Sequence, residues 1–307
     1  MSFKNIIGNN GVKNILTKSL NNNTILHSYM FIGEPGIGKK LIANEFAKMI
    51  LCENFNGVEC NNCKSCVEFY GGNNPDFITI EPEGKVLKIE QIREMQNKVI
   101  EKPVNSSKKV YIINDADLMT KEAQNCLLKT LEEPPSYIVI ILIVSNENKI
   151  LTTIKSRCMK VNFEKISDNE IKNYLLDICG IENVNNNILK LCDGSIGKCL
   201  SIKEKLDDYV QLDKIFSNIN ISLNSFVNSA EIIYKNKESI NDYLDYINVI
   251  LYNYVKSEIE GKERYINSIK IVEKTKQRLL SNSNYDMCID YLIFNIWEEI
   301  NEKNCRG

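Results

Sequence analysis

The sequence predicts an α/β domain built on a parallel sheet, followed by a segment that is entirely helical. Three observations indicate this fold class. A glycine-rich loop at 33–39 connects an apolar, strand-like run to a helical pattern. Further strand-like runs alternate with helical patterns as far as Phe163, and only helical patterns follow it. Strands that alternate with helices predict a parallel sheet covered on both faces.

The composition is that of an ordinary soluble protein. The chain has 307 residues, 43% hydrophobic and 25% charged, and is long enough for two or three domains. Its formal net charge of −2 gives this chain alone no strong attraction for nucleic acid or an anionic membrane. No signal-peptide core follows Met1, and the apolar run Tyr137 to Val144 is too short to cross a bilayer. We expect a cytoplasmic protein with no membrane partner.

Apolar periodicity places the elements of the α/β domain. Helical spacing predicts helices, whereas continuous or alternating apolar runs predict strands. The expected helices lie at Ile6–Leu20, from Lys39 through Ile50, at Ile89–Ile100 and at Lys121–Glu132. The expected strands lie at Ser28–Ile32, Phe77–Ile80, Val110–Ile113, Tyr137–Val144 and Met159–Phe163. A cysteine-containing segment at about 52–66 interrupts the alternation and is expected to be an insertion.

The helical part of the chain divides into two predicted domains. With 1–163 as the α/β core, we expect a small helical domain at 164–207 and a larger one at 208–307. Ser167 and Glu170 have the spacing of a capping box. In the last domain, apolar residues from Ile240 to Val255 form a stripe wider than a lone surface helix needs, which indicates surplus apolar surface.

The loop at 33–40 has the pattern of a phosphate-binding loop. In such loops backbone N–H groups hold phosphate oxygens, the start of the next helix adds a favourable potential, and a lysine reaches the outer phosphates. Lys40, however, stands where the pattern requires a hydroxyl that helps to hold Mg²⁺. A chance glycine-rich turn is the alternative interpretation. The residues that meet the pattern are Gly33, Gly36, Gly38 and Lys39.

The strand Val110–Ile113 ends in acidic residues where related sites carry a metal-holding carboxylate. In those sites an Asp holds Mg²⁺, and a following Glu often orients the attacking water. Here Asn114 is neutral at the metal position, and Asp115 is one methylene shorter than the expected Glu. Two positions around the metal are therefore chemically wrong. The alternative for Asp115 and Asp117 is that they are solvated turn residues.

Four cysteines have the spacing of a metal site. Two close-spaced thiolate pairs supply a tetrahedral set of soft ligands for Zn²⁺, and a fully protein-ligated ion is structural. An iron–sulfur cluster or free thiols are the alternatives. We expect the scattered cysteines elsewhere to be small buried apolar residues. The predicted ligands are Cys52, Cys60, Cys63 and Cys66, in the pattern C-x7-C-x2-C-x2-C.

Arg157 follows the strand Tyr137 to Val144 by a loop that could present it to a neighbouring subunit. An arginine supplied in trans neutralises charge that develops on a transferring phosphoryl group. A lone surface arginine is otherwise a solvated or ion-paired residue. His27 has no nucleophile to pair with and is expected to be structural.

Taken together, these residues resemble a known family, the bacterial clamp-loader subunits of the AAA+ class. The resemblance covers about residues 3 to 200, and the run that ends in Leu131-Glu132-Glu133-Pro134-Pro135 is its most specific part. It implies an AAA+ core with a zinc module, a small helical lid domain and an all-α collar domain that joins a five-membered ring. It also implies that Arg157 completes the ATP site of the adjacent subunit. The other stretches that carry it are Leu26 to Gly33, the cysteine insertion and Ser156-Arg157-Cys158.

Departures from the family pattern favour its delta-prime type over the ATP-hydrolysing gamma/tau type. Lys40 and Asn114 replace groups that hold Mg²⁺, and Gly197 stands where the motor type has a sensor arginine. Lys198 could substitute in part, so ATP or ADP remains possible at a weak or vestigial site. Asp115 belongs to that site.

The resemblance therefore implies a stator subunit of the DNA polymerase III clamp loader without ATPase activity of its own. Its partners would be gamma/tau and delta subunits in a hetero-pentameric ring and, through the complex, the sliding clamp and primer–template DNA. The alternatives are a gamma/tau-type motor, with Lys39 and Asp115 sufficient for turnover, and a zinc-dependent nucleic-acid-binding module.

Overall fold

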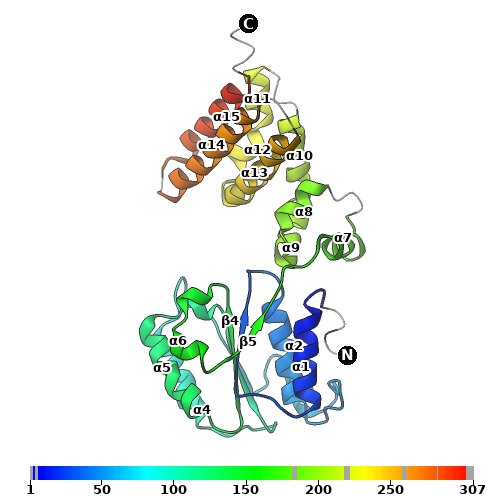
Figure 1. Ribbon diagram of the computed structural model, residues 1–307, viewed down its shortest axis with the longest axis vertical. Helices are drawn as coiled ribbons and strands as arrows, with labels where there is room; N and C mark the ends of the chain where they lie inside the picture. Colours follow the sequence, from blue (N-terminus) through cyan, green and yellow to red (C-terminus); the bar gives the residue numbers. More distant parts are fainter. Residues whose placement is uncertain are drawn as a thin grey trace. The chain divides into compact units, whose positions relative to one another are not determined.

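The computed structural model describes residue 3 and residues 6–181, 185–217, 222–257, 261–281 and 283–301. The chain forms two compact units (Figure 1). The first comprises Met1–Tyr174 with Gly194–Gly197, and the second Leu175–Asp193 with Lys198–Gly307. Within the described ranges, no helix combines the length and the apolar character needed to span a membrane. The predicted division at 163 and 207 stays a prediction.

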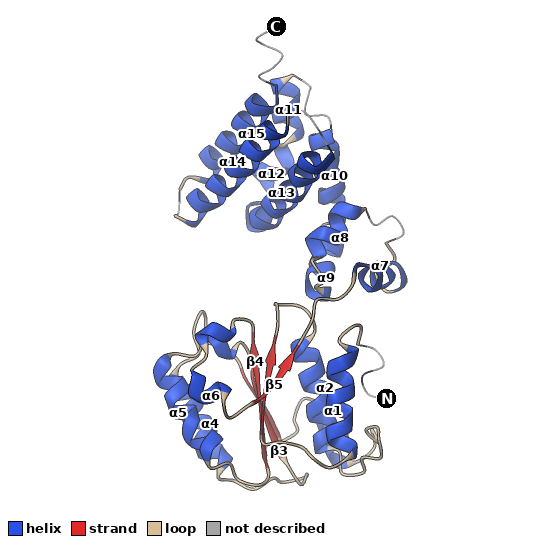
Figure 2. Ribbon diagram, in the orientation of Figure 1, coloured by secondary structure: helices blue, strands red, loops and turns tan. Residues whose placement is uncertain are grey.

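The first unit contains a five-stranded parallel sheet in the order β2-β3-β4-β1-β5 (Figure 2). The predicted parallel α/β fold is therefore confirmed, and each predicted strand lies within one residue of its observed bounds. Strand β1 lies inside the sheet and pairs with β4 on one side and with the edge strand β5 on the other. The strands are β1 (Ser28–Ile32), β2 (Phe77–Ile80), β3 (Lys109–Ile113), β4 (Ile138–Val144) and β5 (Met159–Asn162).

Helices cover both faces of this sheet, as Figure 1 shows. Alternate side chains of a strand point to opposite faces, so Tyr29 and Phe31 pack with Phe46 of α2, whereas Met30 packs on the other face. All of β4 is buried because both faces are covered. Helices α1 (Asn10–Asn21) and α2 (Lys39–Leu51) lie on one side, and α4 (Ile89–Val99), α5 (Lys121–Glu132) and α6 (Thr152–Lys155) on the other.

Two helices of this unit were not predicted, and one begins later than predicted. Helix α3 (Lys64–Tyr70) and α6 are too short for apolar periodicity to identify them. Helix α1 begins at Asn10 rather than Ile6, because Asn9 adopts a left-handed conformation with φ 51° that helical residues do not. The capping box forms, since the Ser167 and Glu170 side chains each bond the other residue's backbone N–H.

A buried carboxylate anchors the chain around the cysteine insertion. Asp76, directly before β2, is fully buried and accepts hydrogen bonds from the backbone N–H groups of residues 104, 105 and 106, at 2.7, 2.8 and 2.8 Å. Ser106, held in this way, bonds Ser65 of α3 through their hydroxyls at 2.9 Å. The insertion is thereby fixed to the sheet.

The second unit consists of helices in its described residues. Tyr209, Tyr243 and Tyr246 form its aromatic core, and the Asp213 carboxylate accepts from the Tyr246 hydroxyl at 2.6 Å. The helices are α8 (Asn186–Cys192), α9 (Ile196–Glu204), α10 (Leu206–Ser217), α11 (Leu223–Ser229), α12 (Glu231–Lys235), α13 (Ile240–Ser257), α14 (Lys262–Leu280) and α15 (Tyr285–Asn301), and α7 (Asp168–Asp177) crosses from one unit to the next along the chain.

The wide apolar stripe of α13 does not mark surplus surface. Ile240, Tyr243, Leu244, Ile247 and Leu251 are all buried, because α13 packs against α8, α10 and α14 at once. The expectation of spare apolar surface on this helix is therefore wrong. A helix in the middle of its own unit needs a wide stripe for that reason alone.

Replacement of Asp76 by Ala should strongly destabilise the first unit. The change leaves three partly buried N–H groups without their acceptor, which costs about 3 kcal/mol. We expect the melting temperature of this unit to fall by about 6–12 °C, measured by circular dichroism. The exposed Glu94 provides the control, since Glu94→Ala should change it little. Equal melting temperatures for the two variants would contradict this assignment.

Candidate functional site

The predicted phosphate loop lies at the carboxyl edge of the sheet, between β1 and α2. The Gly33 N–H donates to the carbonyl of Val144 at 3.2 Å, which ties the loop to β4. Gly36 and Gly38 have φ angles of 77° and 95°, in the left-handed region that favours glycine. The loop borders a cavity of about 310 Å³. Other residues in the cavity wall are Asn114, Asp115 and Ser145, from the ends of β3 and β4.

Lys39 is buried in this site, and the loop itself holds its ammonium group. The Nζ atom donates to the carbonyls of Gly33 at 2.5 Å and Glu34 at 2.7 Å, and to the Ser145 hydroxyl at 3.2 Å. Burial lowers the pKa of Lys39, and the nearby carboxylates of Asp115 and others oppose that shift. A phosphate that binds here would replace some of these acceptors.

Lys40 and Asn114 are the two departures from the metal-binding pattern, and both side chains donate to the carboxylate of Glu81. Glu81, directly after β2, accepts from the Lys40 ammonium at 2.7 Å through one oxygen and from the Asn114 amide at 2.9 Å through the other. The same amide donates to Asp115 at 3.0 Å. The carboxylates of this edge are therefore engaged by a lysine and an amide of the chain itself.

This arrangement does not fit Mg²⁺. The ion needs oxygen ligands in near-octahedral geometry, and in phosphate-loop enzymes a hydroxyl and a carboxylate of the chain supply two of them. Here the first position carries the Lys40 cation, which repels a second cation, and the second carries the Asn114 amide, a donor to Glu81. These two residues therefore supply neither the hydroxyl nor the carboxylate that the metal-binding pattern requires.

Asp115 and Asp117 have different roles. Asp117 is buried and accepts from the backbone N–H of Ser145 at 2.9 Å, so it links the ends of β3 and β4 and is not a solvated turn residue. Asp115 is half-buried with φ 45°. Burial raises its pKa, and the charges of Asp117 and Glu81 add to that effect.

The segment that contains Gly197 packs directly on the loop. The Gly197 N–H donates to the Gly36 carbonyl at 3.0 Å, and the Ser195 hydroxyl donates to the Pro35 carbonyl at 3.2 Å. A Cβ atom on Gly197 would lie 3.0 Å from the Gly36 Cα, closer than ordinary contact. This close approach explains why a glycine, not an arginine, occupies the position. The Lys198 ammonium lies 4.0 Å from the Asp193 carboxylate.

Glu81 and Ser145 are site residues that the sequence analysis missed. Each directly follows a strand of the sheet, Glu81 after β2 and Ser145 after β4. Ligands of parallel α/β sheets bind at the carboxyl ends of the strands, and this rule could have found both residues.

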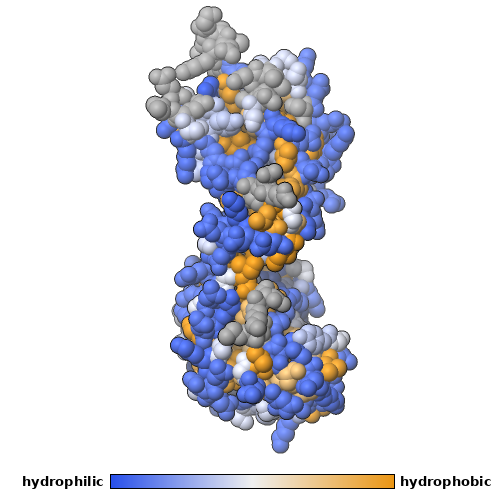
Figure 3. Space-filling view, turned by 90° about the vertical axis from the view of Figure 1, so that its right-hand side faces the viewer, coloured by the Kyte–Doolittle hydropathy of each residue, from blue (hydrophilic) through white to orange (hydrophobic). Residues whose placement is uncertain are grey.

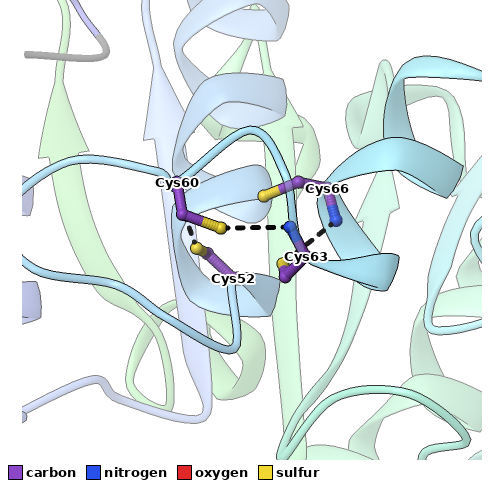
Figure 4. Close-up of side chains that lie close together, drawn as sticks. All are labelled: Cys52, Cys60, Cys63 and Cys66. Carbon is purple, nitrogen blue, oxygen red and sulfur yellow. Dashed lines mark hydrogen bonds between the residues drawn. The ribbon is translucent and has the colours of Figure 1, made fainter.

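The four predicted metal ligands come together in the insertion. The Sγ atoms of Cys52, Cys60, Cys63 and Cys66 all lie within 4.8 Å of one another, and the side chains converge (Figure 4). Tetrahedral zinc with Zn–S bonds of about 2.3 Å places its sulfurs about 3.8 Å apart, which this spacing accommodates. The donor set thus fits a metal ion.

Backbone N–H groups surround these sulfurs. Cys60 donates to the Cys52 sulfur at 3.3 Å, Cys63 to that of Cys60 at 3.3 Å, and Cys66 to that of Cys63 at 3.4 Å. Such bonds stabilise thiolates, and the N–H of Asn62 is the main reason that the pKa of Cys60 falls to about 6. Burial raises the pKa of Cys66.

Arg157 lies at the opposite edge of the sheet from the loop. It follows α6 and precedes β5, and its carbonyl accepts from the Ser28 hydroxyl at 2.6 Å. Its guanidinium is partly exposed, at 35%, and pairs with Glu132 at 2.8 Å and with the Thr153 carbonyl at 2.9 Å. His27, also at this edge, accepts from the Ile140 N–H through its carbonyl at 2.9 Å, as expected of a structural residue.

Comparison with known proteins identifies relatives in DNA polymerase III. A gamma subunit from Buchnera aphidicola is 34% identical over 227 residues, which span 72% of this chain and 61% of the relative. A delta′ subunit from Bacillus subtilis is 34% identical over 166 residues, 54% of this chain and 50% of the relative. A gamma/tau subunit from Mycoplasma pneumoniae is 33% identical over 213 residues, 67% of this chain and 31% of the relative. This chain thus spans between 31% and 61% of the lengths of these relatives.

Among solved structures, a gamma subunit-related protein from Thermotoga maritima is 17% identical with a TM-score of 0.49, covering 92% of this chain and 99% of that one. The family described as "DNA polymerase III, delta subunit" matches residues 8–167, more than half of the chain. The chain therefore belongs to this family of DNA polymerase III subunits, in agreement with its resemblance to the AAA+ clamp-loader subunits.

Proposed function

We propose that this chain is a delta-prime-type subunit of the DNA polymerase III clamp loader. It joins gamma/tau and delta subunits in a five-membered ring that places the sliding clamp on primed DNA. It does not hydrolyse ATP itself and donates Arg157 to the ATP site of a neighbouring motor subunit. The family membership and the relatives named gamma/tau and delta′ support this reading.

The observation that carries the proposal is the ion pair between Lys40 and Glu81. Lys40 stands at the sequence position of the metal-binding hydroxyl, and the Asn114 amide donates to the second oxygen of Glu81. Without Mg²⁺, the charge on the transferring phosphoryl group and the leaving group has no main stabiliser. The loop therefore keeps its fold and loses its catalysis.

The position of Arg157 supports a role in trans. Its carbonyl accepts a hydrogen bond from Ser28, the first residue of β1. The loop begins at Gly33, directly after the last residue of the same strand. At about 3.3 Å per strand residue, the two sites are about 16 Å apart. An arginine side chain does not span this distance, so Arg157 cannot serve its own loop.

Arg157 forms an ion pair with Glu132 that a phosphate of a partner subunit's nucleotide can replace. The pair is partly exposed, at 35% for Arg157 and 50% for Glu132, and such pairs contribute about 0–1 kcal/mol. A neighbouring nucleotide phosphate, with more negative charge, can replace this carboxylate at little cost.

A gamma/tau-type motor is the second candidate, because relatives named gamma match longer stretches than the delta′ relative. The ion pair between Lys40 and Glu81 argues against a motor, since a motor must hold Mg²⁺ at this edge of the sheet.

For the cysteine cluster we propose a structural Zn²⁺ ion. The four-sulfur donor set leaves no open position for chemistry, and the N–H bonds to sulfur favour thiolates. Its role would be to hold the insertion against α2, whose Lys48 is buried and bonds Glu59 and Tyr70. The helices from 208 onward are proposed as the collar, on the family resemblance alone.

Replacement of Arg157 by Ala should lower the DNA-stimulated ATPase of the reconstituted clamp loader. The turnover contributed by the site that Arg157 completes should fall by about a thousandfold, because an arginine finger stabilises transition-state charge by that factor or more. Assembly, measured by gel filtration, should stay intact. Arg93→Ala, which removes an exposed arginine of α4, is the matched control and should keep full activity. Unchanged ATPase in the Arg157→Ala complex would remove the proposed role.

Metal analysis of the purified chain should find about one zinc per chain. Cys63→Ser should lose the metal and lower the melting temperature of the first unit, since the insertion then lacks its cross-link. Cys126→Ser is the control, because its thiol outside the cluster donates to Gln96 at 3.0 Å and a hydroxyl can do the same. Iron, or no metal, in the unmodified chain would reject the zinc assignment.

A further inference from the structure

We propose that the loop at 33–40 binds the diphosphate group of a nucleotide without a divalent metal ion, with the Lys40 ammonium in place of Mg²⁺. This inference rests on the proposed function, in which the loop does not hydrolyse ATP. It goes further because it names the ligand of the loop, a nucleotide diphosphate that carries no bound metal ion.

Two lysines of the chain place positive charge beside the cavity, where a diphosphate would bind. Lys39 and Lys40 are consecutive in the first turn of α2, and both lie in the wall of the cavity. The N–H groups at the start of this 13-residue helix add to their field. Lys40 is half-exposed, at 52%, so its ammonium can turn toward a ligand at small cost.

The same residues keep a metal ion out. The Lys40 ammonium pairs with Glu81 at 2.7 Å, and the Asn114 amide donates to both Glu81 and Asp115, so both of these carboxylates already have a partner from the chain. A divalent ion at this edge would face the Lys40 charge whether the ammonium contacts Glu81 or a bound phosphate, because the lysine is covalently part of the chain. Mg²⁺ also gives up its water reluctantly, and no protein hydroxyl replaces that water here.

The size and lining of the cavity favour a diphosphate. At about 310 Å³ it is at the small end of ligand cavities, and its wall consists of glycines, two lysines, short polar side chains and aliphatic residues, with no aromatic side chain to stack on a base. Free ADP carries one negative charge fewer than free ATP, which suits two ammonium groups that also face Glu81 and Asp115. Binding requires Lys39 to exchange the Glu34 carbonyl or the Ser145 hydroxyl for a phosphate oxygen.

Calorimetric titration of the full chain with ADP tests this proposal. The buffer is freed of divalent ions on a chelating resin, because a soluble chelator would also attack the cysteine cluster. We expect ADP to bind without Mg²⁺, to bind no more tightly when millimolar Mg²⁺ is added, and to be displaced by inorganic pyrophosphate. Lys40→Thr should weaken Mg²⁺-free binding about tenfold, whereas Lys121→Thr, an exposed first-turn lysine of α5, should not.

The double variant Lys40→Thr with Asn114→Asp restores the metal ligands that the family pattern requires. In this variant Mg²⁺ should tighten ADP binding at least about tenfold. Melting curves establish that each variant is folded. Absence of ADP binding in the Mg²⁺-free buffer, tighter binding by the unmodified chain with Mg²⁺, or failure of pyrophosphate to compete would each overturn the proposal. Failure here leaves the Arg157 result in the assembled complex unaffected, so the two proposals are tested separately.

Discussion

The parallel pairing of β1 with β4 and β5 is the constraint on which the rest of the structure depends. It sets the phosphate loop at the carboxyl end of β1 and the backbone of Arg157 at the other end, bonded to Ser28. Because all strands run the same way, the ends of β2, β3 and β4 meet the loop at one edge. The sheet thus separates the groups that face the chain's own loop from the arginine that faces away from it.

The contacts at the loop edge show how the carboxylates near the loop are stabilised by side chains of the chain itself. A site without Mg²⁺ leaves carboxylates close together, and such a cluster is costly without a counter-charge. Lys40 supplies that charge to Glu81, and the Asn114 amide bonds both Glu81 and Asp115. Gly197 packs on Gly36 and closes the far side of the loop. These contacts are mutually consistent and join residues that lie far apart in the sequence.

Much of the fold followed from local patterns, whereas the contacts within the site did not. The strands were predictable because a sheet buried on both faces requires apolar runs such as 138–144. The engagement of Lys40 by Glu81 joins positions 41 residues apart, and the Arg157–Glu132 pair likewise depends on the tertiary fold. Apolar periodicity shows how wide the apolar face of a helix is, but it does not show which elements pack on that face. For this reason the apolar stripe of α13 was misread as surplus surface.

The central claim is that this loop has the shape of a nucleotide-hydrolysing site and the charge distribution of an inert one. The most direct test is the steady-state ATPase rate of the purified chain with Mg-ATP, compared with that of Lys39→Ala. We predict no difference between the two rates, because a lysine and an amide stand where the pattern requires the hydroxyl and the carboxylate that hold Mg²⁺. Steady hydrolysis by the unmodified chain that Lys39→Ala abolishes would contradict the account.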